Sequence, residues 1–322
     1  MQKKLRRFVG PTLALVLFTL AIRLLWNEAN KISWEEFVAG LTGVPATYIA
    51  IAAFLIALNY GLLICYDILA LRYVCRPLPL RQISLVSFLG FTLGNNLGTL
   101  AAAAPIRYRF YHRFGLSHRQ ILAVMSVLAL TFWSGTCILG GTVLVLVPVE
   151  LPAKFDLPVG TRTLGAILLL VATVYALVCF VWHKPIPLGG LRLRPPPIGL
   201  AATQASVAMV DLVISATALY LVLPGDVPVP FATVLAAYLV AITVSIISQV
   251  PGGLGVLELI LLTLLKDSVG DVVLASVLLF RVLYYVLPLM FGMVTLVAHE
   301  IYAGAVEIRA DARDDSGESQ VN

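Results

Sequence analysis

Long apolar runs, separated by short polar or basic segments, are the main pattern along this chain. About 17 to 25 predominantly apolar residues are needed to cross the hydrocarbon core of a bilayer as a helix. Runs that meet this requirement are predicted to be full membrane spans. The predicted spans cover residues 8–26, 46–71, 120–148, 163–183, 198–223 and 272–298.

Two further apolar segments, 82–104 and 231–265, are interrupted by glycines next to polar residues or proline. The first interruption reads GNNLGT at 94–99 and the second reads QVPGGLG at 249–255. Glycine weakens a helix, and lipid offers no hydrogen-bond partners to the freed backbone groups. Each segment is therefore predicted to be a broken helix that packs inside the protein or lines a cavity.

Composition restricts the class of protein further. Hydrophobic residues make up 60% of the 322 residues, charged residues only 12%, and the mean hydropathy is +0.96. An ordinary soluble domain has roughly 25% charged residues. The sequence thus predicts an all-α integral membrane protein, and excludes a cytosolic enzyme, a secreted disulfide scaffold and a disordered chain. Transporters, channels, membrane-embedded enzymes and assembly factors remain.

The distribution of basic residues predicts the orientation, because cytoplasmic loops collect Lys and Arg. With the N-terminus inside, 16 of the 22 Lys and Arg fall on the cytoplasmic side, provided that 82–104 enters from the cytoplasm and returns. Segment 231–265, flanked by loops poor in basic residues, would dip from the outside. The alternative is a full crossing by 231–249, which is about 28 Å long as a helix.

Two hairpins that enter from opposite sides are typical of inverted-repeat transporters. This interpretation predicts a polytopic domain over 1–306 with halves of about 1–183 and 198–306. A proline-rich cytoplasmic connector, 184–197, joins the halves, and the polar tail 307–322 is expected to be disordered in the cytoplasm. Both termini then face the cytoplasm.

Charged residues inside apolar segments are the first candidates for function, because a charge in the membrane is costly. They are Asp67, Arg107, Asp211, Glu258 and Arg281. The alternative is that these residues form internal ion pairs that fix helix packing.

The glycine turn after Gln249 is a second candidate. Gly252, Gly253 and Gly255 bring backbone amides to the start of a helix, where a phosphate or carboxylate is favoured. A glycine hinge needed only for close packing is the alternative. The sequence contains no motif for a metal ligand set, a cofactor or an activated nucleophile, so no cofactor and no enzymatic activity are predicted.

Three motifs identify a family resemblance: SFLGFTLGNNLGTLAAAAPIRYRFYHRFGLS (87–117), SQVPGGLGVLE (248–258) and LFRVLYYVLPL (279–289). In this order they resemble the transmembrane, flippase-type domain of the bacterial lysylphosphatidylglycerol synthetase/flippase family, which includes the multiple peptide resistance factor. The resemblance covers roughly 45–298. It implies movement of a phospholipid, aminoacylated in the best-known relatives, between leaflets of the inner membrane. Synthetase activity is not implied, because the sequence has no aminoacyl transferase domain.

The charges and polar groups agree with a lipid head group as ligand. Arg107, Arg109 and Arg281 are suited to a phosphate, whereas the carboxylates are suited to a lipid amine or to protons. The resulting set of substrate-binding candidates is Asp67, Asn95, Asn96, Arg107, Arg109, Asp211, Gly252, Gly253, Gly255, Glu258, Arg281 and Tyr285.

The lipid ligand is a phospholipid or a polyprenyl phosphate, and no nucleic acid is expected. A rival interpretation is a non-transporting membrane protein that presents lipid to a separate transferase. A small-solute carrier is disfavoured, because the apolar segments offer few polar groups for a hydrated path. Protein partners consistent with these interpretations are a second copy of the chain or that separate transferase.

Overall fold

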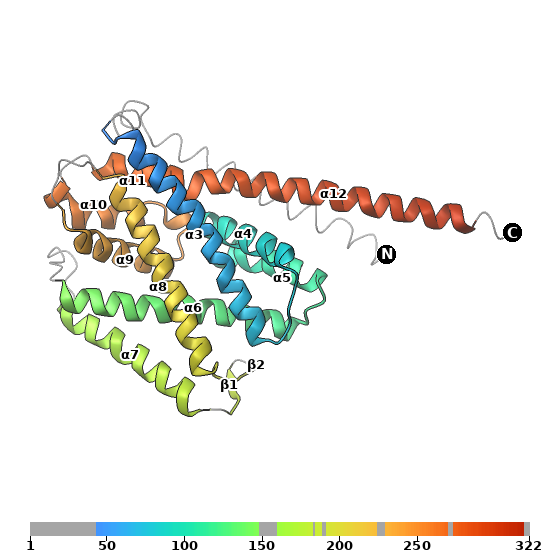
Figure 1. Cartoon of the computed structure of the whole chain (residues 1–322), viewed down its shortest axis with the longest axis horizontal. Coiled ribbons are helices and arrows are strands. Elements are labelled where there is room, and N and C mark those ends of the chain that lie inside the picture. The colour runs from blue at the N-terminus through green and yellow to red at the C-terminus, as the bar shows by residue number, and fades with distance from the viewer. Residues whose placement is uncertain are drawn as a thin grey trace.

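The computed structural model describes residues 43–147, 160–182, 184–188, 191–223, 229–269 and 273–318. Over these residues the chain is a bundle of long helices, several of which cross one another (Figure 1). The elements are α3 (Ala46–Tyr73), α4 (Leu80–Leu97), η1 (Thr99–Ala103), α5 (Ala104–Arg113), α6 (His118–Leu146), α7 (Thr161–Val181), β1 (Ile186–Leu188), β2 (Leu191–Leu193), α8 (Ile198–Leu221), α9 (Phe231–Ser248), η2 (Pro251–Gly253), α10 (Val256–Val269), α11 (Val273–Arg281), η3 (Val282–Val286) and α12 (Leu287–Glu318).

Among the described residues, six helices are long and apolar enough to cross a membrane. Five of them, α3, α6, α7, α8 and the continuous helix 273–302, coincide with predicted spans. The sixth is α9, the first arm of the broken segment 231–265. The predicted span 8–26 lies outside the described residues. The prediction of an all-α integral membrane protein is confirmed.

The segment around Asn95 and Asn96 forms a helical hairpin, as predicted. The helix α4 ends at Gly98, whose φ of 95° is a conformation that favours glycine, and a short π-helical turn leads into α5. The two arms are antiparallel, since Gly90 lies against Arg107 while Gly94 lies against Ala103. We call residues 80–113 hairpin 1.

The second broken segment is also a hairpin, which we call hairpin 2 (residues 231–269). The helix α9 ends at Gln249 in a left-handed conformation, the turn η2 follows, and α10 packs back along α9. With 18 residues, α9 is about 27 Å long, so it is long enough to cross before the chain returns.

The two hairpins meet at their tips. Gly252 has a φ of 64°, and a Cβ added there would lie 2.9 Å from the carbonyl oxygen of Asn96. Glycine is required at this position both by the backbone conformation and by the close approach. The breaks predicted from the sequence therefore lie together inside the protein.

The helix α8 packs against both α3 and α6, although it belongs to the opposite half of the sequence (Figure 1). One apolar core includes Ile56 and Leu63 of α3, Leu212 of α8 and Leu239 of α9. Residues from both sequence halves thus share one apolar core.

The proline-rich connector contains regular secondary structure, which the sequence analysis did not predict. Strands β1 and β2 pair as a small antiparallel hairpin in which Ile186 lies opposite Leu193. The hydroxyl of Tyr73, at the end of α3, donates a hydrogen bond of 2.6 Å to the carbonyl oxygen of Arg194. This bond attaches the connector to α3.

The C-terminal tail was expected to be disordered from residue 307, but α12 continues as a helix to Glu318 and projects from the body (Figure 1). Extending an existing helix adds residues without the cost of a new nucleus, which favours continuation into a polar segment.

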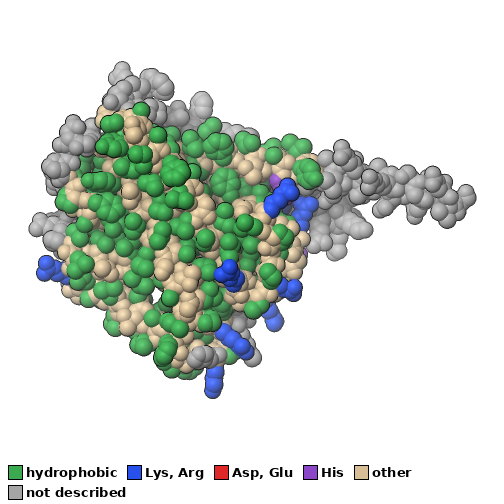
Figure 2. Space-filling model, in the orientation of Figure 1, with side chains coloured by type: hydrophobic (Ala, Val, Ile, Leu, Met, Phe, Trp, Pro, Cys, Tyr) green, Lys and Arg blue, Asp and Glu red, His purple; other side chains and the backbone are tan. Residues whose placement is uncertain are grey.

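The surface is that of a protein surrounded by lipid. Hydrophobic side chains cover most of the face seen in Figure 2, and most of the visible basic side chains gather toward its right and lower edges. Large apolar side chains such as Phe54, Leu170 and Phe180 are more than 60% exposed. Soluble proteins rarely expose apolar patches of this extent.

Candidate functional site

A cavity of about 730 Å³ lies between the two hairpins, bounded further by α3, α6, α8 and η3. Most of its wall is apolar, including Phe132 and Trp133 of α6. Its polar lining is Tyr66, Asn95, Thr99, Arg107, Ser126, Asp211, Tyr238, Gln249, Tyr284 and Tyr285.

The cavity reaches the molecular surface. Three of its lining side chains, Leu100, Leu122 and Ile247, are 76%, 45% and 64% exposed. They come from η1, α6 and the end of α9. An amphiphile in the cavity would therefore have an apolar route to the surrounding lipid.

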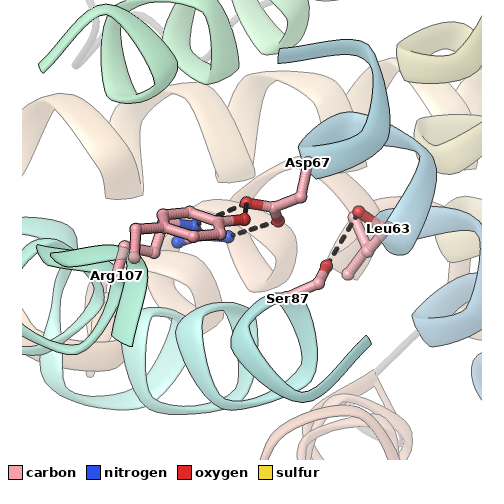
Figure 3. A network of polar contacts seen from close by, with 5 residues as sticks. Leu63, Asp67, Ser87 and Arg107 are labelled. Carbon is pink, nitrogen blue, oxygen red and sulfur yellow. Dashed lines mark hydrogen bonds and ion pairs between the residues drawn. The ribbon is translucent and has the colours of Figure 1, made fainter. Parts of the chain in front are cut away.

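Among the described residues, Arg107 alone contributes a basic side chain to the cavity lining, and it forms a two-point ion pair with Asp67 (Figure 3). Its Nε lies 3.2 Å from Oδ1 of Asp67 and its Nη2 lies 3.1 Å from Oδ2. The hydroxyl of Tyr111 donates a further hydrogen bond of 2.6 Å to Oδ1. Asp67 is completely buried, so this pair is removed from water apart from the side of Arg107 that faces the cavity.

Hairpin 1 positions the Arg107 guanidinium. A Cβ at Gly90 would lie 2.7 Å from Cζ of Arg107, so a larger residue at this position would force the guanidinium to move. The guanidinium also lies over the ring of Phe91, with 4.5 Å between Cζ and the ring centroid. Beside the pair, the hydroxyl of Ser87 donates a hydrogen bond of 3.0 Å to the carbonyl oxygen of Leu63, which joins α4 to α3 (Figure 3).

Asp211 supplies the cavity's acidic group from the middle of α8. The Tyr66 hydroxyl donates a hydrogen bond of 2.7 Å to its Oδ2. A buried polar cluster follows on the same helix. In it, the amide nitrogen of Asn59 on α3 donates to the hydroxyl oxygens of Ser215 on α8 and Tyr284 in η3 at 2.8 and 3.0 Å.

Glu258 and Arg281 form a second ion pair, which does not line the cavity. Nη2 of Arg281 lies 2.9 Å from Oε2 of Glu258 and 3.0 Å from the carbonyl oxygen of Gly253. A second contact joins Nε to Oε1. The backbone N–H of Gly255 donates to Oε2 of Glu258 at 2.9 Å. The anion site expected at the glycine turn is therefore filled, at Gly255, by the chain's own carboxylate.

Asn96 and Arg109 also lie away from the cavity lining. Asn96 is buried and donates to the carbonyl oxygens of Thr92 and Tyr285 at 2.8 and 3.2 Å, which ties α4 to η3. Arg109 pairs with Glu300 of α12 at 2.7 Å. Asn96 thus connects hairpin 1 to η3, and Arg109 connects it to α12.

Comparison with known proteins places the chain in a family. It is 32% identical over 318 residues to the uncharacterised protein slr0712 of Synechocystis, covering 98% of each chain. It is 30% identical over 310 residues to the inner membrane protein YbhN of Escherichia coli, covering 95% of this chain and 97% of YbhN. The chain belongs to the YbhN family. No protein-family model matches it.

A more distant likeness agrees with the sequence motifs. The chain is 23% identical over 297 residues to the phosphatidylglycerol lysyltransferase of Staphylococcus haemolyticus, and this match spans 33% of that enzyme. The two YbhN-family relatives that match over their full length have no enzymatic name. Together with the apolar helices, the likeness to YbhN identifies a multi-pass inner-membrane protein.

Of the predicted binding residues, the structure brings Asn95, Arg107, Asp211 and Tyr285 to the cavity. It places Asp67 directly behind Arg107. The other candidates, which form the second ion pair, the glycine turn and the links to α12 and η3, do not line it. Their contact with lipid stays a prediction.

Sequence reasoning missed other polar residues that line the cavity: Tyr66, Thr99, Ser126, Tyr238 and Gln249. A tyrosine in the middle of an apolar span is a weak signal, but Tyr66 adjoins Asp67 and could have been selected for that reason. Among the described residues no cluster of three His, Cys, Asp or Glu could hold a metal ion.

Proposed function

We propose that this protein moves a phospholipid between the leaflets of the bacterial inner membrane. The observation that carries the proposal is the cavity between the two hairpins, which combines a buried arginine with apolar walls that extend to exposed leucine and isoleucine side chains. A lipid needs both kinds of surface, because its phosphate is charged and its acyl chains are apolar.

Arg107 is suited to the phosphate. Its Nε and Nη2 are bonded to Asp67, whereas its Nη1 has no hydrogen-bond partner among the described residues. A phosphate oxygen can accept from such a group, and arginine binds phosphate with charge-assisted hydrogen bonds. Asn95, half-buried on the same wall, offers an amide to the ester or glycerol oxygens. The acyl chains would leave the cavity past Leu100 and Ile247.

The tip-to-tip contact of the hairpins supports transport, since broken helices meet at the substrate site in inverted-repeat transporters. We propose that hairpin 1 enters from the cytoplasm and hairpin 2 from the outside. Single cysteines at Arg113 and Lys266, in a background without the four native cysteines, test this with a membrane-impermeant thiol reagent. Labelling of Arg113→Cys from outside, or of Lys266→Cys from the cytoplasm, would contradict the opposed arrangement.

The function is tested with proteoliposomes that contain the purified chain and a fluorescent phosphatidylglycerol. The distant relative's name refers to this lipid, which makes it the first probe. We expect dithionite to quench more than the outer-leaflet half of the fluorescence, because the protein exchanges lipid between leaflets. Glu300→Gln, remote from the cavity lining, serves as the matched control.

The same assay separates transport from lipid presentation. Binding of the fluorescent lipid without leaflet exchange would favour the non-transporting partner of a transferase. Repeating the assay with a polyprenyl phosphate probe distinguishes the two classes of phosphate-bearing lipid. If the protein neither binds nor exchanges either probe, the proposed function is contradicted.

A further inference from the structure

The described side chains include four carboxylates, and they differ in their partners. Asp67 pairs with Arg107, Glu258 with Arg281, and Glu300 with Arg109. The fourth, Asp211, has no ion pair among the described residues, although its side chain is buried and only 6% of the residue is exposed.

The groups that face Asp211 are polar but uncharged. Tyr66 of α3 donates to it, and the other titratable neighbours are the phenols of Tyr60, Tyr238 and Tyr284 from α3, α9 and η3. The part of α6 that lines the cavity, 122–133, has no charged side chain. From α5, Arg107 lines the same cavity, but it is paired with Asp67.

We propose that Asp211 is a proton-binding site through which lipid movement is coupled to the proton gradient. The inference rests on the proposed function and adds an energy source to it. An ionised carboxylate without a cation is costly in the membrane interior, so its charge must be neutralised by a cation that arrives through the cavity. A proton fits the site, because the neighbouring hydroxyls can donate to the carboxylate or accept from the neutral acid.

The proton transfer balances simply. Hydronium in the open cavity gives its proton to a carboxylate oxygen of Asp211, which leaves water and a neutral carboxyl group. When the cavity opens to the other side, the carboxyl group returns the proton to water there. No oxidant, metal or further reactant is needed.

The neighbouring residues on α3 connect this site to the phosphate-binding residue. Tyr66 bonds Asp211, and the next residue, Asp67, bonds Arg107. Successive residues of a helix point about 100° apart, so one turn of α3 contacts both groups. A neutral Asp211 can donate to the Tyr66 hydroxyl instead of accepting from it, and a shift of Tyr66 moves the Asp67 backbone. Protonation of Asp211 is thereby linked to the ion pair between Asp67 and Arg107.

Infrared spectroscopy of the full-length protein in liposomes tests protonation without any transport measurement. We expect a carboxylic-acid carbonyl band that appears and disappears as the pH is changed. The band should be absent in Asp211→Asn and retained in Glu300→Gln, whose carboxylate is paired with Arg109. A titrating band of undiminished size in Asp211→Asn would overturn the proposal.

Proteoliposomes with fluorescent phosphatidylglycerol and a pH-sensitive dye inside test coupling. For one proton per lipid, a gradient of about one pH unit shifts the leaflet distribution by up to about tenfold. We expect this shift in the wild type and in Glu300→Gln, with a matching change of internal pH. In Asp211→Asn the leaflet distribution of the lipid should not respond to the pH gradient, whatever rate of lipid exchange this variant retains.

The other outcomes are informative. A distribution that follows a sodium gradient instead of a pH gradient would overturn the proton site. So would an Asp211→Asn protein that keeps its pH response and changes only its preference between phosphatidylethanolamine and phosphatidylglycerol, because Asp211 would then bind a head-group ammonium. A titrating band in a protein that exchanges no lipid would contradict the proposed function but not the proton site.

Discussion

Hairpin 1 and hairpin 2 are built from the same parts. In each, a helix ends at a residue with positive φ, Gly98 or Gln249, and the second arm returns along the first. That second arm contributes one member of a buried or part-buried ion pair. In hairpin 1 the arm carries the cation, Arg107, and its partner lies on α3. In hairpin 2 the arm carries the anion, Glu258, and its partner lies on α11.

The difference lies in what surrounds each pair. Arg107 lines a large cavity, whereas Glu258 and Arg281 do not, and they also bond the backbone of the glycine turn. A costly intramembrane charge can therefore be neutralised inside the protein without facing this cavity. Under the proposed function, Arg107 binds a phosphate through Nη1 while it stays paired with Asp67, whereas the contacts of the second pair are with the turn of hairpin 2.

The largest effect is expected for Arg107→Ala. It leaves Asp67 buried without a cation, which costs about 3–5 kcal/mol of stability, and it removes the proposed phosphate ligand. Thermal unfolding in detergent and the leaflet-exchange assay measure the two losses. The double variant Asp67→Asn with Arg107→Gln should regain stability but not exchange. Recovery of exchange would show that the pair is purely structural.

Arg281→Ala should cost about 3 kcal/mol, at the lower end of the range for a broken buried pair, because the Glu258 side chain keeps some exposure. The matched double variant, Glu258→Gln with Arg281→Met, should regain both stability and leaflet exchange. This result would show that leaflet exchange needs the ion pair of hairpin 1 but not that of hairpin 2. A stable double variant without exchange would instead place the second pair on the lipid path.

Gly252→Ala tests the contact between the hairpin tips. A non-glycine residue in the left-handed region costs about 1–2 kcal/mol, and at Gly252 the added Cβ would also press on the Asn96 carbonyl oxygen. Gly255→Ala is the control, since Gly255 has a φ of 78° but nothing within 4 Å of an added Cβ. Unfolding measurements should show the larger loss for Gly252→Ala. Equal losses would mean that the tip contact contributes little.

The smallest effect is expected for Arg109→Ala. The Arg109 and Glu300 side chains are 21% and 16% exposed, so this part-buried pair is more accessible to water than the other two pairs, and water weakens the attraction between its charges. We expect a small change in the unfolding temperature and leaflet exchange close to the wild-type rate. Loss of exchange at unchanged stability would return Arg109 to the list of lipid-binding residues.

Predicting the helices needed only local information. Span length and the helix breaks at Gly98 and Gln249 depend on hydropathy and glycine within a few residues, so the broken segments could be predicted from their own sequence. The connector was harder, because two three-residue strands are too short to give a pattern. The continuation of α12 beyond residue 307 was not predicted. A polar composition indicates that a segment is exposed to water, but it does not indicate whether a preceding helix extends into it.

Predicting the site needed distances between segments far apart in the chain. Asp67 and Arg107 are 40 residues apart, and Tyr66 and Asp211 are 145 apart. Several pairings of the five intramembrane charges are compatible with the sequence. The sequence therefore supplied the candidates without showing which of them share a cavity.

By itself, the sequence determined that this protein lies in a membrane as helices with two broken hairpins, because burial in lipid requires apolar length and forbids unsatisfied backbone. Only the tertiary structure decided which charges are neutralised by one another and which face a cavity. Neutralisation depends on a few ångströms of separation across helices, and neither composition nor periodicity contains that distance. Among the four carboxylates with described side chains, the structure pairs three with arginines. Only these pairings show that Asp211 differs from the other three in having no ion pair.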